Sequence, residues 1–140
     1  MVYFVDTNIF LRTLVKEDEK SFKECYLFLN LIKGNKIKVF TSSLVLAEID
    51  WVLESFYKFG KSEVIKALNS ILKLKGLKII DRTNVQLALE IFQNKNIKFI
   101  DALIVSNSQI FQKKVIVVSY DRDFDKIGVK RKEPKEILRA

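Results

Sequence analysis

Hydrophobic residues along the chain fall into short apolar runs separated by longer segments with helical spacing. Val2–Val5 and Val115–Val118 are apolar at every position, as expected of strands buried on both faces of a sheet. Residues 36–41 alternate between polar and apolar, which indicates a half-exposed strand, and residues 77–80 form another strand. Strands that alternate with helices indicate a parallel sheet covered on both faces. The pattern therefore predicts a three-layer α/β/α sandwich with a central, mainly parallel sheet.

The helices are predicted from apolar residues three or four positions apart and from residues that favour helix ends. Helices are expected from about residue 8, over 17–33, from 42 or 43 to 57, from 62 to Gly76, over 83–94 and over 101–112. Asp81 is expected to cap the helix that follows it. Residues 129–137 are expected to add an edge strand and a final turn. The sequence has no repeats or linkers, so residues 1–140 are expected to form a single domain.

The composition restricts the chemistry that the chain can perform. The sequence contains no His and one cysteine, Cys25. Catalytic triads with His, His-ligated zinc and thiolate zinc sites are therefore excluded. Enzyme chemistry must come from carboxylates, hydroxyls, amides, Lys or Arg, with or without a hard metal ion. Cys25 lies in a helical pattern among apolar residues, so we expect a small core residue rather than a reactive thiol.

Charge and hydropathy indicate the partners and the compartment. The formal net charge is +8, which favours a polyanionic partner, although a lysine-rich surface also serves solubility. No apolar stretch approaches the roughly 20 residues that span a bilayer, and no signal peptide is recognisable. A lone cysteine suits a reducing compartment. We therefore expect a cytoplasmic protein without membrane contact.

Two acidic residues follow the two fully apolar strands. Asp6 comes directly after the first strand, and Asp121 stands three residues beyond the end of the other. In open parallel sheets, ligands bind beyond the carboxyl ends of the strands. If the two strands are parallel, Asp6 and Asp121 lie at the same edge of the sheet.

Three further acids are candidates for the same site. Glu48 has apolar neighbours three and four positions away on its predicted helix, and a buried acid is costly unless it is paired or bound to a metal. Asp101 opens a predicted helix, where an N-cap is the ordinary role of Asp. Asp123 belongs to an alternating acidic run that a solvated turn would also explain. One site that binds Mg²⁺ or Mn²⁺ explains these acids together, because a cation removes their mutual repulsion.

Several of these motifs, in this order and spacing, resemble the PIN-domain family. The segments are 5–11, the helix that carries Glu48, 101–104 and 119–124. More narrowly, the chain resembles the VapC toxins of toxin–antitoxin pairs over essentially its whole length. The resemblance implies a parallel sheet sandwiched by helices and an endoribonuclease that leaves 5′-phosphate and 3′-hydroxyl ends. It also implies a homodimer that a protein antitoxin neutralises.

The resemblance further implies a role for each residue that matches the family's motifs. The acids that would hold one or two Mg²⁺ or Mn²⁺ ions are Asp6, Glu48, Asp101 and Asp121, with Asp123 as an auxiliary acid. The polar groups beside these carboxylates would be the hydroxyls of Thr7 and Ser119 and the amide of Asn8. The nearest candidates in sequence to position the RNA backbone are Arg12 and Arg122.

Other functions are compatible with parts of this pattern. A haloacid-dehalogenase-like phosphatase also has an Asp after its first strand, but it needs a second acid where this chain has Asn8. A non-catalytic RNA-binding or assembly module would have no reason to keep uncompensated acids. An RNA-maturation nuclease remains the alternative to a toxin. The helices also carry aromatic residues that form either an antitoxin groove or part of the core: Phe22, Phe28, Trp51, Phe56 and Tyr57.

Overall fold

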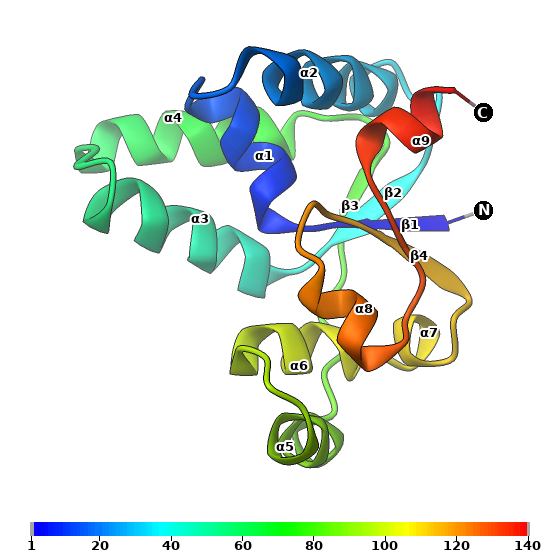
Figure 1. Cartoon of the computed structure of the whole chain (residues 1–140). Coiled ribbons are helices and arrows are strands. Elements are labelled where there is room, and N and C mark those ends of the chain that lie inside the picture. The colour runs from blue at the N-terminus through cyan, green and yellow to red at the C-terminus, as the bar shows by residue number, and fades with distance from the viewer. Residues whose placement is uncertain (1, 140) are drawn as a thin grey trace.

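The structure, a computed structural model, describes residues 2–139. Its centre is a sheet of five parallel strands in the order β3-β2-β1-β4-β5 (Figure 1). The strands are β1 (Val2–Val5), β2 (Val39–Thr41), β3 (Leu77–Ile79), β4 (Val115–Val118) and β5 (Arg131–Lys132). The two fully apolar runs, β1 and β4, pair along their whole length. Their carboxyl ends therefore lie next to each other at one edge of the sheet.

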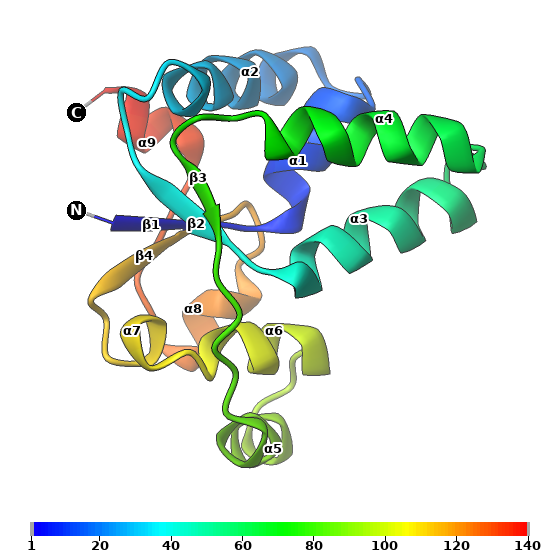
Figure 2. The same cartoon turned by 180° about the vertical axis from the view of Figure 1, so that it is seen from behind.

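Helices cover both faces of this sheet, as Figures 1 and 2 show from opposite sides. One face carries α1 (Thr7–Leu14), α2 (Glu19–Lys33), α4 (Lys61–Leu72) and α9 (Pro134–Leu138). The other face carries α5 (Val85–Asn94), α6 (Phe99–Val105), α7 (Ser108–Phe111) and α8 (Asp123–Ile127). Helix α3 (Ser43–Ser55) extends beyond the carboxyl ends of the strands. The predicted α/β sandwich with a parallel sheet is confirmed.

Large apolar side chains from both helical layers and the sheet form the core. Phe10, Phe28 and Phe124 are completely buried, and burying one such side chain contributes about 1.5–3 kcal/mol. Cys25 is also completely buried, which confirms the prediction of a core residue. The prediction of a half-exposed strand at 36–41 is wrong, because only Val39–Thr41 form a strand and all three residues are buried. This strand lies between β1 and β3 in the sheet, and helices cover both faces of that sheet.

The predicted helix 101–112 differs from the observed structure in its start and its continuity. Helix α6 already begins at Phe99, and Lys98 is its N-cap, so Asp101 lies in the first turn rather than at the cap. The helix then stops, and Asn107 starts α7 by accepting hydrogen bonds from the backbone N–H groups of Gln109 and Ile110. An Asn side chain competes in this way with helical hydrogen bonding.

Two predicted helix-end residues have different roles in the structure. Asp81 does not cap the helix after it, because Asn84 is the N-cap of α5. Its carboxylate instead accepts hydrogen bonds from the backbone N–H and the hydroxyl of Ser43, at the start of α3. Helix α4 ends at Leu72, before Gly76. Gly76 is needed for close packing, since a Cβ there would lie 2.2 Å from the carbonyl oxygen of Ile37.

The C-terminal part of the chain contains one helix that the pattern did not predict. Residues 123–127 form α8, with Phe124 buried and the acids of the alternating run around it. The edge strand and final turn predicted over 129–137 are confirmed as β5 and α9. Within residues 2–139, no helix is both long enough and apolar enough to cross a membrane.

Candidate active site

The predicted acids come from five different elements and meet beyond the carboxyl ends of β1 and β4. Asp6 follows β1, Glu48 lies on α3, Asp101 lies on α6, Asp121 follows β4 and Asp123 begins α8. Asp6 and Asp101 are almost completely buried, with 4% and 3% of their surface exposed. The other three are half-buried. The sheet topology therefore places acids that are more than one hundred residues apart in one region.

Three of these acids form a compact group, which we call the acid cluster: Asp101, Asp121 and Asp123. Each offers a carboxylate oxygen, and the three oxygens lie within 4.8 Å of one another. The Oδ2 atom of Asp101 is buried and has no hydrogen-bond partner among the described residues. A buried polar atom without a partner is costly. An unpartnered oxygen in a group of three carboxylates fits a cation ligand better than a structural hydrogen bond.

Asp6 is held beside the acid cluster by polar side chains. Its Oδ2 atom accepts hydrogen bonds from the hydroxyl of Ser119 at 2.6 Å and from the amide of Asn8 at 3.2 Å. The Asn8 amide also donates to Ser119 Oγ and accepts from the backbone N–H of Tyr120. These bonds tie the residues after β1 to those after β4 and fix the orientation of the Asp6 carboxylate.

Glu48 is positioned by groups from two other helices. The hydroxyl of Thr7, on α1, donates to Glu48 Oε1 at 2.5 Å. The ammonium group of Lys98, at the start of α6, lies 3.7 Å from Glu48 Oε2. No Lys or Arg lies within one helical turn of Glu48 in the sequence. The fold brings Lys98, fifty residues further along the chain, next to it.

The turn after β4 arranges the remaining acids. The backbone N–H of Asp121 donates to Ser119 Oγ, and the backbone N–H of Asp123 donates to Asp121 Oδ1. Asp123 also forms an ion pair with Lys126, one turn further along α8, at 2.9 Å. Asp121 is therefore oriented by the backbone, whereas Asp123 shares its charge with a neighbouring lysine.

Burial and mutual repulsion change the protonation of the two most buried acids. Burial raises the pKa of Asp101 to about 7, and the nearby charge of Asp6 adds to this effect. Burial also raises the pKa of Asp6 to about 6, although the hydrogen bond from Ser119 opposes it. Both pKa values are raised because ionising the two buried carboxylates together costs free energy, and a bound cation removes that cost. The donor set consists of oxygens, which fits a hard ion such as Mg²⁺ or Mn²⁺.

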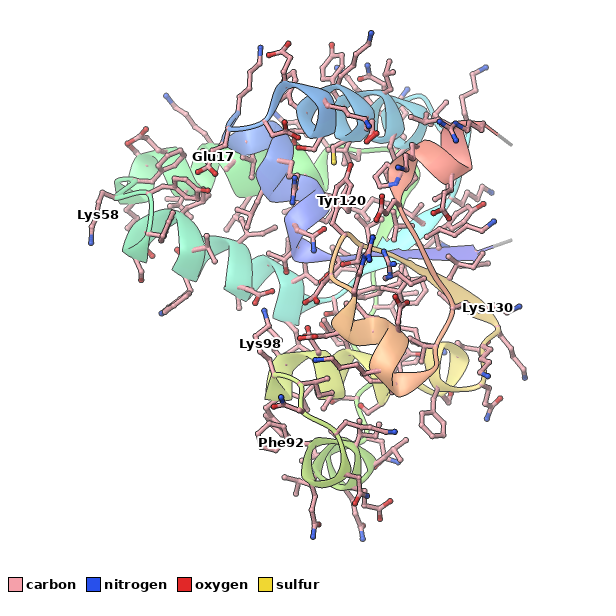
Figure 3. All side chains as sticks on the ribbon, in the orientation of Figure 1. Glu17, Lys58, Phe92, Lys98, Tyr120 and Lys130 are labelled. Atoms are coloured by element: carbon pink, nitrogen blue, oxygen red, sulfur yellow. The ribbon has the colours of Figure 1, made fainter. Side chains whose placement is uncertain are left out.

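The two predicted RNA-backbone residues occupy different environments. The guanidinium of Arg12 lies 4.4 Å from the centre of the Tyr120 ring and donates to Ser21 Oγ (Tyr120 is labelled in Figure 3). Arg122 is exposed beside α8. Lys98, which contacts Glu48, was not among the site residues predicted from the sequence. Its position three residues before Asp101, one helical turn away, was the available signal.

The chain belongs to the PIN-domain family. The family model described as "PIN domain" matches residues 3–130, which covers most of the chain and all of the acids described above. The predicted family resemblance is confirmed. No curated protein sequence matches the chain.

Solved structures with the same fold include VapBC2 and the toxin VapC20. The chain is similar to VapBC2 from Rickettsia felis, solved bound to a DNA fragment from its promoter, with 25% identity, a TM-score of 0.67 and coverage of 95% of this chain and 98% of that one. VapC20 from Mycobacterium tuberculosis, a sarcin-ricin loop cleaving toxin, has 18% identity, a TM-score of 0.64 and coverage of 92% and 96%. PAE2754 from Pyrobaculum aerophilum has 14% identity, a TM-score of 0.67 and coverage of 99% and 93%. The last two likenesses concern the fold alone.

Proposed function

We propose that this protein is a metal-dependent endoribonuclease and the toxin of a VapBC-type toxin–antitoxin pair. The observation that carries the proposal is the convergence of Asp101, Asp121 and Asp123 with a buried, unpartnered carboxylate oxygen. The family match and the likeness to VapBC2 support the same conclusion. The net charge of +8 fits a polyanionic substrate such as RNA.

The residues of the chain have separable roles in this proposal. Asp6, Asp101 and Asp121 would hold Mg²⁺ or Mn²⁺, with Glu48 and Asp123 binding directly or through water. A bound ion supplies an activated water and stabilises negative charge on the phosphate. Thr7 keeps the Glu48 carboxylate in place through its hydroxyl, and Ser119 and Asn8 do the same for Asp6. At metal sites, groups that hydrogen-bond to the ligands hold those ligands in a fixed orientation.

A protein antitoxin and a second copy of the chain are the partners that we propose. The structural neighbour VapBC2 supports a protein antitoxin. Of the aromatic residues predicted to form either a groove or the core, Phe28 is in the core, whereas Trp51 and Phe56 are 68% and 71% exposed. Exposed aromatic side chains of this kind mark partner surfaces. Phe22 and Tyr57 are half-buried.

A homodimer is supported by a second exposed apolar surface. Val85, Leu89 and Phe92 on α5 are about half exposed and recur on one side of the helix. Light scattering of the purified protein tests the homodimer, and a monomer at micromolar concentration would contradict it.

Cleavage of labelled single-stranded RNA by the purified protein tests the nuclease. We expect cleavage with Mg²⁺ or Mn²⁺, none with EDTA, and none by Asp6→Asn, which removes one carboxylate from the site. Glu90→Gln is the matched control, because Glu90 is an exposed acid on α5. Metal-dependent cleavage by Asp6→Asn at the wild-type rate would contradict the site.

A growth assay separates a toxin from an RNA-maturation nuclease. A toxin arrests a bacterial host when it is expressed alone, and the protein encoded beside it restores growth. Asp101→Asn should be harmless in the same host. Active nuclease that does not slow growth would favour RNA maturation, and metal binding without cleavage of any RNA would favour a non-catalytic module.

A further inference from the structure

Two lysines contact acids of the proposed metal site: Lys126 pairs with Asp123 within α8, and Lys98 pairs with Glu48 across two helices. The Lys98 ammonium is 3.7 Å from Glu48 Oε2, and the lysine side chain is 61% exposed. Figure 3 labels Lys98, whose side chain rises from the start of α6 towards α3. Among residues 2–139, it is the only Lys or Arg within 4.0 Å of a carboxylate of Asp6, Glu48, Asp101 or Asp121.

Neutralising Glu48 does not account for this lysine by itself. Only the glutamate of this pair is shielded from water, and a mostly solvated lysine contributes little to stability through an ion pair. Glu48 already accepts a hydrogen bond from Thr7 on its other oxygen. A bound metal ion would also neutralise Glu48, which leaves the ammonium free for another anion.

The position of Lys98 is fixed relative to the acid cluster. Its backbone carbonyl accepts hydrogen bonds from the N–H groups of Asp101 and Ala102 in the first turn of α6. These bonds fix the backbone of Lys98 one helical turn before Asp101, and its exposed side chain brings the ammonium to Glu48. A phosphate reaches buried carboxylates from the solvent, and a cation on the solvent-exposed side of the site offsets their repulsion of it. An ammonium group has three donors, and contact with Glu48 needs only one.

We propose that Lys98 is a catalytic residue that donates a hydrogen bond to a non-bridging oxygen of the scissile phosphate. This inference rests on the proposed nuclease function and adds a residue to it. The Lys98 ammonium pairs with Glu48 in the free protein and contacts the phosphate when RNA is bound. Donors aimed at charge that develops in the transition state lower the barrier of the chemical step.

The test compares Lys98→Met and Lys98→Arg with Lys135→Met. Lys135 is the matched control, because its ammonium also lies 3.7 Å from a glutamate, Glu133, but on α9 across the sheet. For each variant, kcat and KM for single-stranded RNA are measured with saturating Mn²⁺, and Mn²⁺ affinity is measured by calorimetry without RNA.

We expect kcat of Lys98→Met to fall by about 100-fold, the usual effect of losing one such donor. Its Mn²⁺ affinity should stay the same or rise, because a competing cation has left Glu48. Lys98→Arg, which keeps the charge and the donors, should recover most of the rate. Lys135→Met should resemble the wild type. Lys98→Gln is measured in the same way if the Met variant does not fold.

Three results would overturn the proposal, and they can be told apart. A kcat within threefold of the wild type would remove Lys98 from the catalytic step. Weakened Mn²⁺ binding that accounts for the lost rate would make Lys98 a structural support of the metal site. A wild-type protein that cuts no RNA would overturn the nuclease and the role of Lys98 together.

Discussion

The buried carboxylate of Asp101 should make the metal-free protein less stable than a variant without that charge. Asp101 has 3% of its surface exposed, and its Oδ2 atom has no hydrogen-bond partner among residues 2–139. Asp101→Asn keeps the size of the side chain and removes the charge. We therefore predict that Asp101→Asn abolishes RNA cleavage and raises the stability of the protein in EDTA.

The size of the effect follows from the protonation of Asp101. Burial raises its pKa from 3.8 to about 7, and each pH unit corresponds to about 1.4 kcal/mol, so the ceiling is about 4 kcal/mol. Between these two values the folded protein binds more protons than the unfolded chain. Stability of the wild type therefore falls as pH rises through this window, and the full cost is present above pH 7. Desolvation of the new amide reduces the expected gain of Asp101→Asn to about 2 kcal/mol at pH 8.

Thermal unfolding in EDTA measures this gain. About 2 kcal/mol corresponds to a rise in Tm of roughly 4–8 °C for a chain of this size. The gain should shrink at pH 5, because wild-type Asp101 is then protonated and carries no charge. Glu90→Gln, which removes an exposed acid, should change Tm by less than about 2 °C. A lower Tm of Asp101→Asn than of the wild type at pH 8 would contradict this prediction. The same gain in Tm at pH 5 and at pH 8 would contradict it as well.

Three further predictions concern the metal site and the fold. Mn²⁺ affinity should rise between pH 5.5 and 8, by up to about tenfold per pH unit for each proton displaced. The reason is that burial raises the pKa of Asp6 to about 6 and that of Asp101 to about 7. An Mn²⁺ affinity that calorimetry finds to be independent of pH would contradict this prediction. Thr7→Val removes the hydrogen bond to Glu48 and should slow RNA cleavage about tenfold or more, whereas full activity would show that Glu48 needs no such support. Gly76→Ala places a Cβ 2.2 Å from the Ile37 carbonyl oxygen and should cost about 2–3 kcal/mol in urea unfolding, so wild-type stability would refute the close packing.

Most of the fold could be predicted from hydrophobic periodicity, because the pattern of each strand and helix is local in the sequence. The continuous apolar runs β1 and β4 could only be central strands of a parallel sheet, and they are. Boundaries set by single side chains were not predictable. Asp81 bonds to Ser43, thirty-eight residues earlier, and a sequence pattern carries no signal for such a contact. The interruption at Asn107 similarly depends on a local side-chain bond that competes with the helix.

The candidate site was predictable as a set of acids but not as a geometry. Strand ends placed Asp6 and Asp121 at the same edge, as the paired strands β1 and β4 now show. The contact between Lys98 and Glu48 depends on how α6 packs near α3, which periodicity does not determine. Arg12 follows Asp6 closely in sequence, and in the structure its guanidinium stacks on Tyr120 and donates to Ser21. Both contacts depend on the direction of a side chain in the folded protein, which its position along the sequence does not determine.

Anomalous diffraction from a crystal soaked in Mn²⁺ tests the central claim most directly, because it locates the cation among the acids. We expect a strong peak in contact with carboxylate oxygens of Asp101 and Asp121, with Asp6 as a further ligand or one water away. The same soak of Asp101→Asn crystals should give no peak at that position. A wild-type crystal without a peak there, or with Mn²⁺ bound only at exposed acids elsewhere, would contradict the claim that these carboxylates form a metal site.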